Sequence, residues 1–128
     1  MLAGDVNVIV NATMTGAVDI TGIGYAIGHY ARWVKPGAVR VDATSSDPPV
    51  QVSAFRDDSR GTVALVLINN AATLKSVSIN FTGLSVTGNW TGEQSTTSGY
   101  WKPFAASSAT PFTIILPETS VTSIGGRL

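Results

Sequence analysis

Short runs of alternating apolar and polar residues, separated by turn-forming residues, constrain the fold of this chain more than any other feature. Residues 50–55 and 76–81 alternate with a period of two, which is typical of a strand with one buried face. Residues 62–68 form a continuous apolar run, so we expect the most buried, central strand there. Further runs predict strands at 6–10, 38–43, 84–91, 113–116 and 120–124. Short strands separated by regular turns predict an all-β fold, a two-sheet antiparallel β-sandwich.

A single short helix is predicted near the N-terminus, at residues 23–34. Apolar residues recur there at three- and four-residue spacing, which places them on one side of a helix: Ala26, Ile27, Tyr30, Ala31 and Val34. Pro36 and Gly37 end the helix, because proline disfavours the helical conformation of the residue before it. We therefore expect one domain. A first strand, a loop and the helix occupy residues 1–37, and the sandwich strands occupy residues 38–128.

Charge and cysteine content exclude several classes of function. Eight basic and eight acidic residues give a net charge of +0, and the basic residues are scattered singly. Nucleic-acid binding and attachment to an anionic membrane both need clustered basic residues, so we expect neither partner. Cysteine is absent, which excludes disulfides, thiolate catalysis and thiolate zinc sites.

The acidic residues and the single histidine offer no credible catalytic set. Glycoside hydrolysis needs two carboxyl groups about 5–9.5 Å apart, and the two glutamates, Glu93 and Glu118, fall in a predicted loop and a predicted turn. Asp57 and Asp58 fit the tip of a β-hairpin better than a calcium site. His29 has no acidic neighbour within helical reach, so we expect a packed or hydrogen-bonded side chain. We therefore predict no enzymatic activity, no metal and no cofactor.

Residues 89–104 hold three large aromatic residues in a polar, glycine-rich segment, where large rings are hard to bury. Aromatic faces suit the C–H patches of sugar rings. We therefore predict an exposed, flat platform for consecutive β-linked sugars, formed by Trp90, Tyr100 and Trp101. The expected polar partners of the sugar hydroxyls are Glu93, Gln94 and Lys102. The alternative is that Tyr100 and Trp101 cover an open end of the sandwich. Six other aromatic residues are expected to be structural: Tyr25, Tyr30, Trp33, Phe55, Phe81 and Phe112.

Residues 25–41 carry a pattern that resembles a known enzyme family. They read Tyr-Ala-Ile-Gly-His-Tyr-Ala-Arg-Trp-Val-Lys-Pro-Gly-Ala-Val-Arg-Val. This is similar to the helix-to-strand passage of glycoside hydrolase family 30, where the catalytic barrel leads into a side-associated β-sandwich. The matching residues are Gly28, Arg32, Pro36, Gly37 and Arg40. His29 stands in place of the family's glutamine and Ala31 in place of its serine.

The resemblance extends over residues 20–125 and implies an accessory domain rather than a hydrolase. Residues 4–11 resemble the family's last barrel strand, but Asn11 and Ala12 stand where that strand ends in an aromatic pair at the sugar site. The strands that carry the catalytic glutamates lie outside this sequence. The implied partner is a catalytic glycoside hydrolase domain in a parent chain. We expect a secreted, extracellular, bacterial protein and a monomer.

Two functions follow from this interpretation, and we predict the first. In the first, the domain is a carbohydrate-binding module for plant cell-wall β-glucan (cellulose, xyloglucan or mixed-linked glucan) or xylan. In the second, it is a structural accessory domain that braces a hydrolase barrel and binds no sugar. An Ig-like protein-interaction domain is a more distant third hypothesis, which the hydrolase-like segments disfavour. The sequence does not choose among the polysaccharides.

Overall fold

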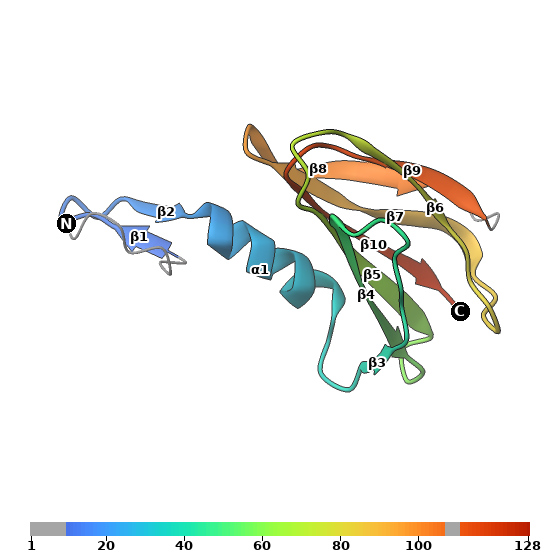
Figure 1. Cartoon of the computed structure of the whole chain (residues 1–128). Helices are drawn as coiled ribbons and strands as arrows, with labels where there is room; N and C mark the ends of the chain where they lie inside the picture. The colour runs from blue at the N-terminus through green and yellow to red at the C-terminus, as the bar shows by residue number, and fades with distance from the viewer. Residues whose placement is uncertain (1–9, 107–110) are drawn as a thin grey trace.

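The structure, a computed structural model, describes residues 10–106 and 111–128 (Figure 1). The described residues form two antiparallel layers of strands and one short helix, so the predicted all-β sandwich is confirmed. Most of the first strand predicted, at 6–10, and most of the segment that resembles a barrel strand, at 4–11, lie outside the described residues.

The larger layer is a six-stranded antiparallel sheet with the strand order β3-β4-β5-β10-β7-β8. Its strands are β3 (Val39–Val41), β4 (Val50–Asp57), β5 (Thr62–Asn69), β7 (Thr87–Thr96), β8 (Gly99–Ala106) and β10 (Ser120–Arg127). The second layer pairs β6 (Lys75–Ile79) with β9 (Phe112–Leu116). β5 has antiparallel partners along its whole length on both sides, β4 and β10, so the apolar run at 62–68 is the central strand that its sequence predicted.

The hydrophobic core fills the space between the two layers. On β5, Val63, Leu65 and Leu67 are buried against Ile79 of β6 and Leu116 of β9. Val66 on the same strand is fully buried on the other face of the sheet, so β5 is covered on both faces. This confirms the prediction that β5 is the most buried strand.

The helix α1 (Gly22–Trp33) lies on the outer face of the six-stranded sheet, mainly against β10 (Figure 1). Thr21 caps it, because its Oγ1 accepts a hydrogen bond from the Gly24 amide at 3.2 Å. A small hairpin of β1 (Val10–Ala12) and β2 (Val18–Ile20) precedes the helix and lies at its far end, away from the sandwich. The predicted helix is therefore confirmed to within one residue at each end.

The β7–β8 hairpin follows the prediction only at its start, where the strand expected at 84–91 overlaps β7 at residues 87–91. Residues 89–104, interpreted as an exposed loop, form most of the β7–β8 hairpin, and Trp90 is fully buried in the core. Its ring stacks on Phe81, with centroids 5.0 Å apart and planes 4° apart, and lies 5.7 Å from the ring of Phe112. The strand β7 alternates as strands do, so Trp90 faces the core while Thr91 and Glu93 face outward to the helix side.

One aromatic residue expected in the core lies elsewhere. Phe55 on β4 faces the helix and meets the ring of Tyr30 edge-on, with centroids 6.2 Å apart. Phe81 and Phe112 do contribute to the core, as predicted. The alternation at 50–55 correctly predicted the strand β4. The sheet has apolar contacts on both faces, however, because α1 covers part of its outer face.

Candidate functional site: the seam between the helix and the sheet

The most distinctive part of the molecule is the contact between α1 and the outer face of β7, β8 and β10, which we call the seam. Two tryptophans interlock there, each over a glycine of the opposing element. A β-carbon at Gly28 of α1 would lie 2.4 Å from Cζ2 of Trp101, on β8. A β-carbon at Gly125 of β10 would lie 2.2 Å from Cζ3 of Trp33, on α1. Only glycine leaves room for these rings, so both positions are part of the seam.

His29 lies at the centre of the seam and is fully buried. Its Nδ1 lies 2.6 Å from Oγ of Ser123 on β10, and its Nε2 lies 2.7 Å from Oγ of Ser95 on β7. Burial lowers the pKa of His29 below its ordinary value of 6.5; the Glu93 carboxylate acts to raise that pKa, and the Arg32 guanidinium acts to lower it. The expectation of a hydrogen-bonded histidine is confirmed.

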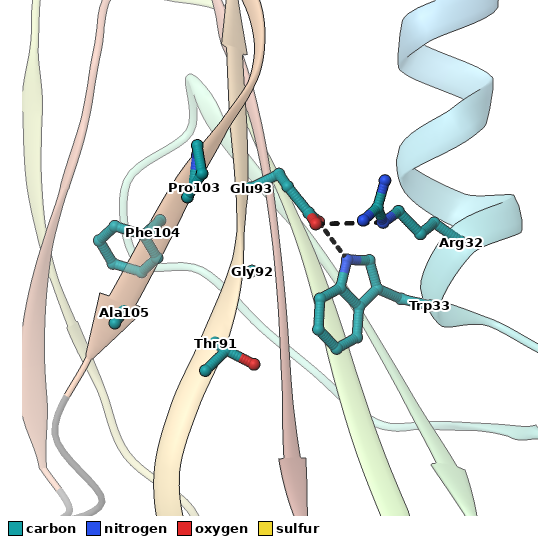
Figure 2. Close-up of a pocket in the computed structure, with 8 residues that line it drawn as sticks. All are labelled: Arg32, Trp33, Thr91, Gly92, Glu93, Pro103, Phe104 and Ala105. Carbon is teal, nitrogen blue, oxygen red and sulfur yellow. Dashed lines mark hydrogen bonds and ion pairs between the residues drawn. The ribbon is translucent and has the colours of Figure 1, made fainter.

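Glu93 fixes the C-terminal end of the helix to β7 (Figure 2). Its carboxylate accepts a hydrogen bond of 2.7 Å from the Trp33 indole N–H and forms an ion pair with Nε of Arg32 at 3.1 Å. Its side chain is only 12 % exposed. A carboxylate held by two donors from the helix is a positioning group, and no second carboxylate accompanies it in the pocket that Figure 2 shows.

A shallow cavity of about 530 Å³ opens beside this pair. Eight residues line it: Arg32, Trp33, Thr91, Gly92, Glu93, Pro103, Phe104 and Ala105. It combines an indole, a guanidinium and a carboxylate with lining residues from β7 and β8 that carry no charge. The cavity can accept a polar ligand with an apolar face, although its carboxylate is already committed to two helix donors.

An aromatic cluster closes the other end of the seam. The ring of Tyr25 stacks on Tyr100, with centroids 4.1 Å apart and planes 4° apart, and meets Trp101 edge-on at 5.1 Å. The Arg32 guanidinium carbon lies 5.4 Å from the centre of the Trp101 ring. Trp101 has a φ of 48°, and the β7–β8 register shifts beside it, so two consecutive residues of β8 turn their rings to the helix.

The predicted sugar platform is not assembled. Trp90 lies in the core on the inner face of the sheet, whereas Tyr100 and Trp101 lie at the helix on the outer face. Tyr100 is 44 % exposed, but its partner in stacking is Tyr25. The prediction of one flat, exposed surface is therefore wrong. The alternative placed Tyr100 and Trp101 over an open end of the sandwich, whereas their rings pack against α1 on the outer face of the sheet.

The three predicted polar partners are also separated. Glu93 belongs to the seam, and Gln94 donates a hydrogen bond of 2.8 Å from its Nε2 to the Ile115 carbonyl of β9, which joins the two layers. Lys102 is exposed on β8, with its aliphatic chain against Gly99. The residues that hold His29 could not be found from the sequence, because Ser95 and Ser123 lie 66 and 94 positions away from it.

Both serine hydroxyls that contact His29 belong to buried residues. Ser95 is 6 % and Ser123 0 % exposed, and His29 forms its hydrogen bonds with these two hydroxyls.

Within residues 10–106 and 111–128, no group of three histidine, aspartate or glutamate side chains could hold a metal ion. No helix in the described part of the chain is long and apolar enough to span a membrane.

The β4–β5 hairpin secures the chain that leaves the helix. The Asp57 carboxylate accepts hydrogen bonds from the Ser59 hydroxyl at 2.6 Å and from the Arg60 guanidinium at 2.6 Å, and these bonds lower the pKa of Asp57 to about 2. Arg60 also donates to the Pro36 carbonyl at 3.1 Å. The hairpin-tip interpretation of Asp57 is confirmed, and the tip also ties the helix–strand connection to the sheet.

Comparison with known proteins identifies the family of this sandwich. The profile of the glycosyl hydrolase family 30 beta sandwich domain matches residues 37–124. The chain belongs to glycoside hydrolase family 30. The family 30 sandwich therefore begins just after α1, so the helix and the hairpin before it lie outside the matched region.

Relatives of this family 30 domain are xylan-degrading enzymes by name. The chain is 27 % identical over 103 residues to a glucuronoxylanase of Bacillus subtilis, covering 71 % of this chain and 24 % of that protein. A family 30 subfamily 8 xylanase from Clostridium acetobutylicum matches with a TM-score of 0.84 and 27 % identity, covering 98 % of this chain and 32 % of that one. A family 30 endoxylanase from Clostridium papyrosolvens matches with a TM-score of 0.78 and 26 % identity, over 85 % and 28 %. The chain thus spans about a third or less of these proteins.

Proposed function

We propose that this family 30 domain is a non-catalytic structural accessory that braces the catalytic domain of a secreted xylanase, with α1 as the element shared by the two. The observation that carries the proposal is that α1 has two different sides. One side packs against the sandwich through Trp33, His29 and Gly28, the glycine that lies against Trp101. The other side is apolar and exposed.

The exposed side is continuous with the hairpin before the helix. Ile23 is 41 % and Ile27 47 % exposed, which places them away from the sheet on α1. Ile27 belongs to the apolar side of the helix that the sequence predicted, and the structure leaves it exposed. Further large apolar side chains on the hairpin are exposed: Val10, Met14, Val18 and Ile20. An apolar surface of this kind is typical of an interface.

The expected occupant of this surface is the catalytic domain of the parent enzyme. The family sandwich begins at residue 37, whereas the Clostridium acetobutylicum xylanase matches 98 % of this chain, and so has counterparts of nearly all of it. The match occupies only 32 % of that xylanase. The remaining two thirds of such an enzyme supply a surface large enough to cover Ile23, Ile27 and the hairpin.

Binding of xylan or β-glucan by the domain is the second candidate. The 530 Å³ cavity beside Trp33 supports it. A sugar ring can stack on an indole, and its hydroxyls can form hydrogen bonds with a guanidinium and a carboxylate. The names of the relatives favour xylan as the polysaccharide. Against it stand the burial of Trp90 and the commitment of Glu93 to the helix.

A graft experiment tests the bracing function. Residues 1–128 replace the matching segment of the Bacillus subtilis glucuronoxylanase, and a control enzyme lacks the sandwich that corresponds to residues 37–124. Bracing predicts that the control melts at a lower temperature and that the graft recovers the lost stability and the xylan hydrolysis. A graft no more stable than the control would contradict the proposal.

Affinity gel electrophoresis of the isolated chain tests the second candidate. Soluble glucuronoxylan and mixed-linked β-glucan are cast separately into native gels. Bracing predicts migration equal to that in a gel without polysaccharide. Retarded migration that is lost in Trp33→Ala, with folding confirmed, would establish sugar binding at the cavity instead.

A further inference from the structure

The hydrogen bonds around His29 determine where its proton lies. The Ser95 Oγ accepts a hydrogen bond of 2.9 Å from the Trp101 amide, so the Ser95 hydroxyl hydrogen is free to point at Nε2 of His29, 2.7 Å away. Nε2 then accepts, and Nδ1 carries the proton and donates to Ser123 Oγ at 2.6 Å. This assignment satisfies both ring nitrogens, the Ser95 hydroxyl and the Trp101 amide, and it leaves the imidazole neutral.

A protonated imidazole does not fit this arrangement. Both ring nitrogens would then donate, so Ser95 would have to accept from Nε2 and from the Trp101 amide at once. Its hydroxyl hydrogen would lose its acceptor in a site with no exposed surface at His29. Burying a charge and orphaning a donor are both unfavourable.

The charged groups around the ring do not compensate fully for a buried cation. From β7 the Glu93 carboxylate faces the site, but it is bound to Trp33 and Arg32 of the helix. From α1, Arg32 adds a positive charge. β8 carries Tyr100 and Lys102, β10 carries only Arg127 at its far end, and β5 carries no charged residue. Burial outweighs the Glu93 carboxylate, and the pKa of His29 is lowered.

We propose that His29 is an acid-sensitive latch: its protonation releases α1, with the hairpin it carries, from the outer face of the sheet. Release separates Trp33 from Gly125 and Trp101 from Gly28, because both rings are held by the approach of helix to sheet. A 12-residue helix without a packed face is marginal in water, so α1 unfolds when it undocks. The proposal concerns this chain alone and does not depend on the bracing function.

The expected pH dependence follows from the sign of the shift. The folded pKa of His29 lies below 6.5, so docking is fully favoured above pH 6.5 and weakens as the pH falls towards the folded pKa. For one proton, the equilibrium constant for undocking rises up to about tenfold for each pH unit in that window. Asp57, with a pKa of about 2, titrates below it and does not contribute.

Hydrogen exchange of the α1 amides between pH 7 and pH 5 tests the latch, with His29→Gln as the control. Glutamine can donate and accept as His29 does but cannot take up a proton in this range. After correction for intrinsic exchange, protection of α1 in the parent protein is expected to fall up to about tenfold per pH unit below 6.5, while that of His29→Gln stays constant. Equal pH dependence in the two proteins would overturn the proposal.

Nuclear magnetic resonance of the unmodified protein provides a test that needs no variant. The ring nitrogens of His29 are expected to show a neutral imidazole with the proton on Nδ1 at pH 7. The titration midpoint is expected below 6.5. A midpoint at or above 6.5, or a proton on Nε2 in the neutral ring, would overturn the latch.

Discussion

Gly28→Ala is the substitution that most directly examines the interlocked seam. The new β-carbon would lie 2.4 Å from Cζ2 of Trp101, whereas carbon atoms in contact normally lie about 3.5–4.0 Å apart. The helix or the indole must therefore move by about 1 Å or more. The indole has little freedom, because Tyr25 meets one edge and the Arg32 guanidinium lies over the ring. Overpacking of this kind costs about 1–3 kcal/mol.

Gly22→Ala in the same helix is the matched control. A β-carbon there would lie 3.6 Å from the Tyr100 hydroxyl, an ordinary contact. Replacing glycine by alanine inside a helix is itself favourable by up to about 1 kcal/mol. Gly22 is the first residue of α1, so the comparison of the two variants removes part of that gain. Urea unfolding, followed by circular dichroism, is expected to place Gly28→Ala about 1–3 kcal/mol below Gly22→Ala.

The same substitution in a Trp101→Ala protein tests whether contact with the Trp101 ring causes the loss of stability. In Trp101→Ala the ring is gone, so adding Gly28→Ala is expected to be neutral or stabilising, and the two substitutions are strongly non-additive. The reasoning would be refuted if Gly28→Ala were as stable as Gly22→Ala, or if the cost persisted unchanged when Trp101 is removed.

Three further outcomes are expected. Trp90→Ala loses about 3–5 kcal/mol of unfolding free energy, because a fully buried ring is removed; unchanged stability in urea would place that ring at the surface. Leu65→Ala, at a side chain 4 % exposed in the central strand, loses about 2–5 kcal/mol, and a loss below about 1 kcal/mol would indicate an exposed edge. The lowered pKa of Asp57, about 2 against an ordinary 3.8, makes its contribution to stability complete above pH 3.8 and lost as the pH falls towards 2. The acid unfolding of Asp57→Asn is expected to lack the loss of stability that protonation of Asp57 causes in the parent protein. Identical acid-unfolding curves for the two proteins would exclude this contribution of Asp57.

The elements of the fold could be predicted where the sequence pattern is local. The alternation at β4, β6 and β9, the apolar run of β5 and the spacing of α1 all lie within a single element, so one stretch of sequence is enough to indicate each. Only the first half of β7 was predicted, as part of the strand expected at 84–91. The second half resembles a loop in sequence, because Glu93 and Ser95 meet the helix through polar groups.

The seam could not be predicted, because it depends on residues that are distant in the sequence. Gly125 and Gly28 must be glycine only because tryptophan rings lie over them. The hydrogen-bond partners of His29 lie 66 and 94 positions away from it in the sequence. The platform prediction failed for a related reason. Neighbouring aromatic residues in the sequence were taken to share a surface, whereas Trp90 and Trp101 lie on opposite faces of one sheet.

The most direct test of the bracing account is the effect of Ile27→Glu on thermal unfolding, measured both in the isolated chain and in the xylanase graft. Ile27 is 47 % exposed on the side of α1 that faces away from the sheet, so the isolated chain is expected to lose little, within about 0.5 kcal/mol. In the graft, the same carboxylate would be buried without a partner against the catalytic domain, and a loss of several degrees in Tm is expected. An equal, small effect in both proteins would show that nothing covers this side of the helix and would contradict the account.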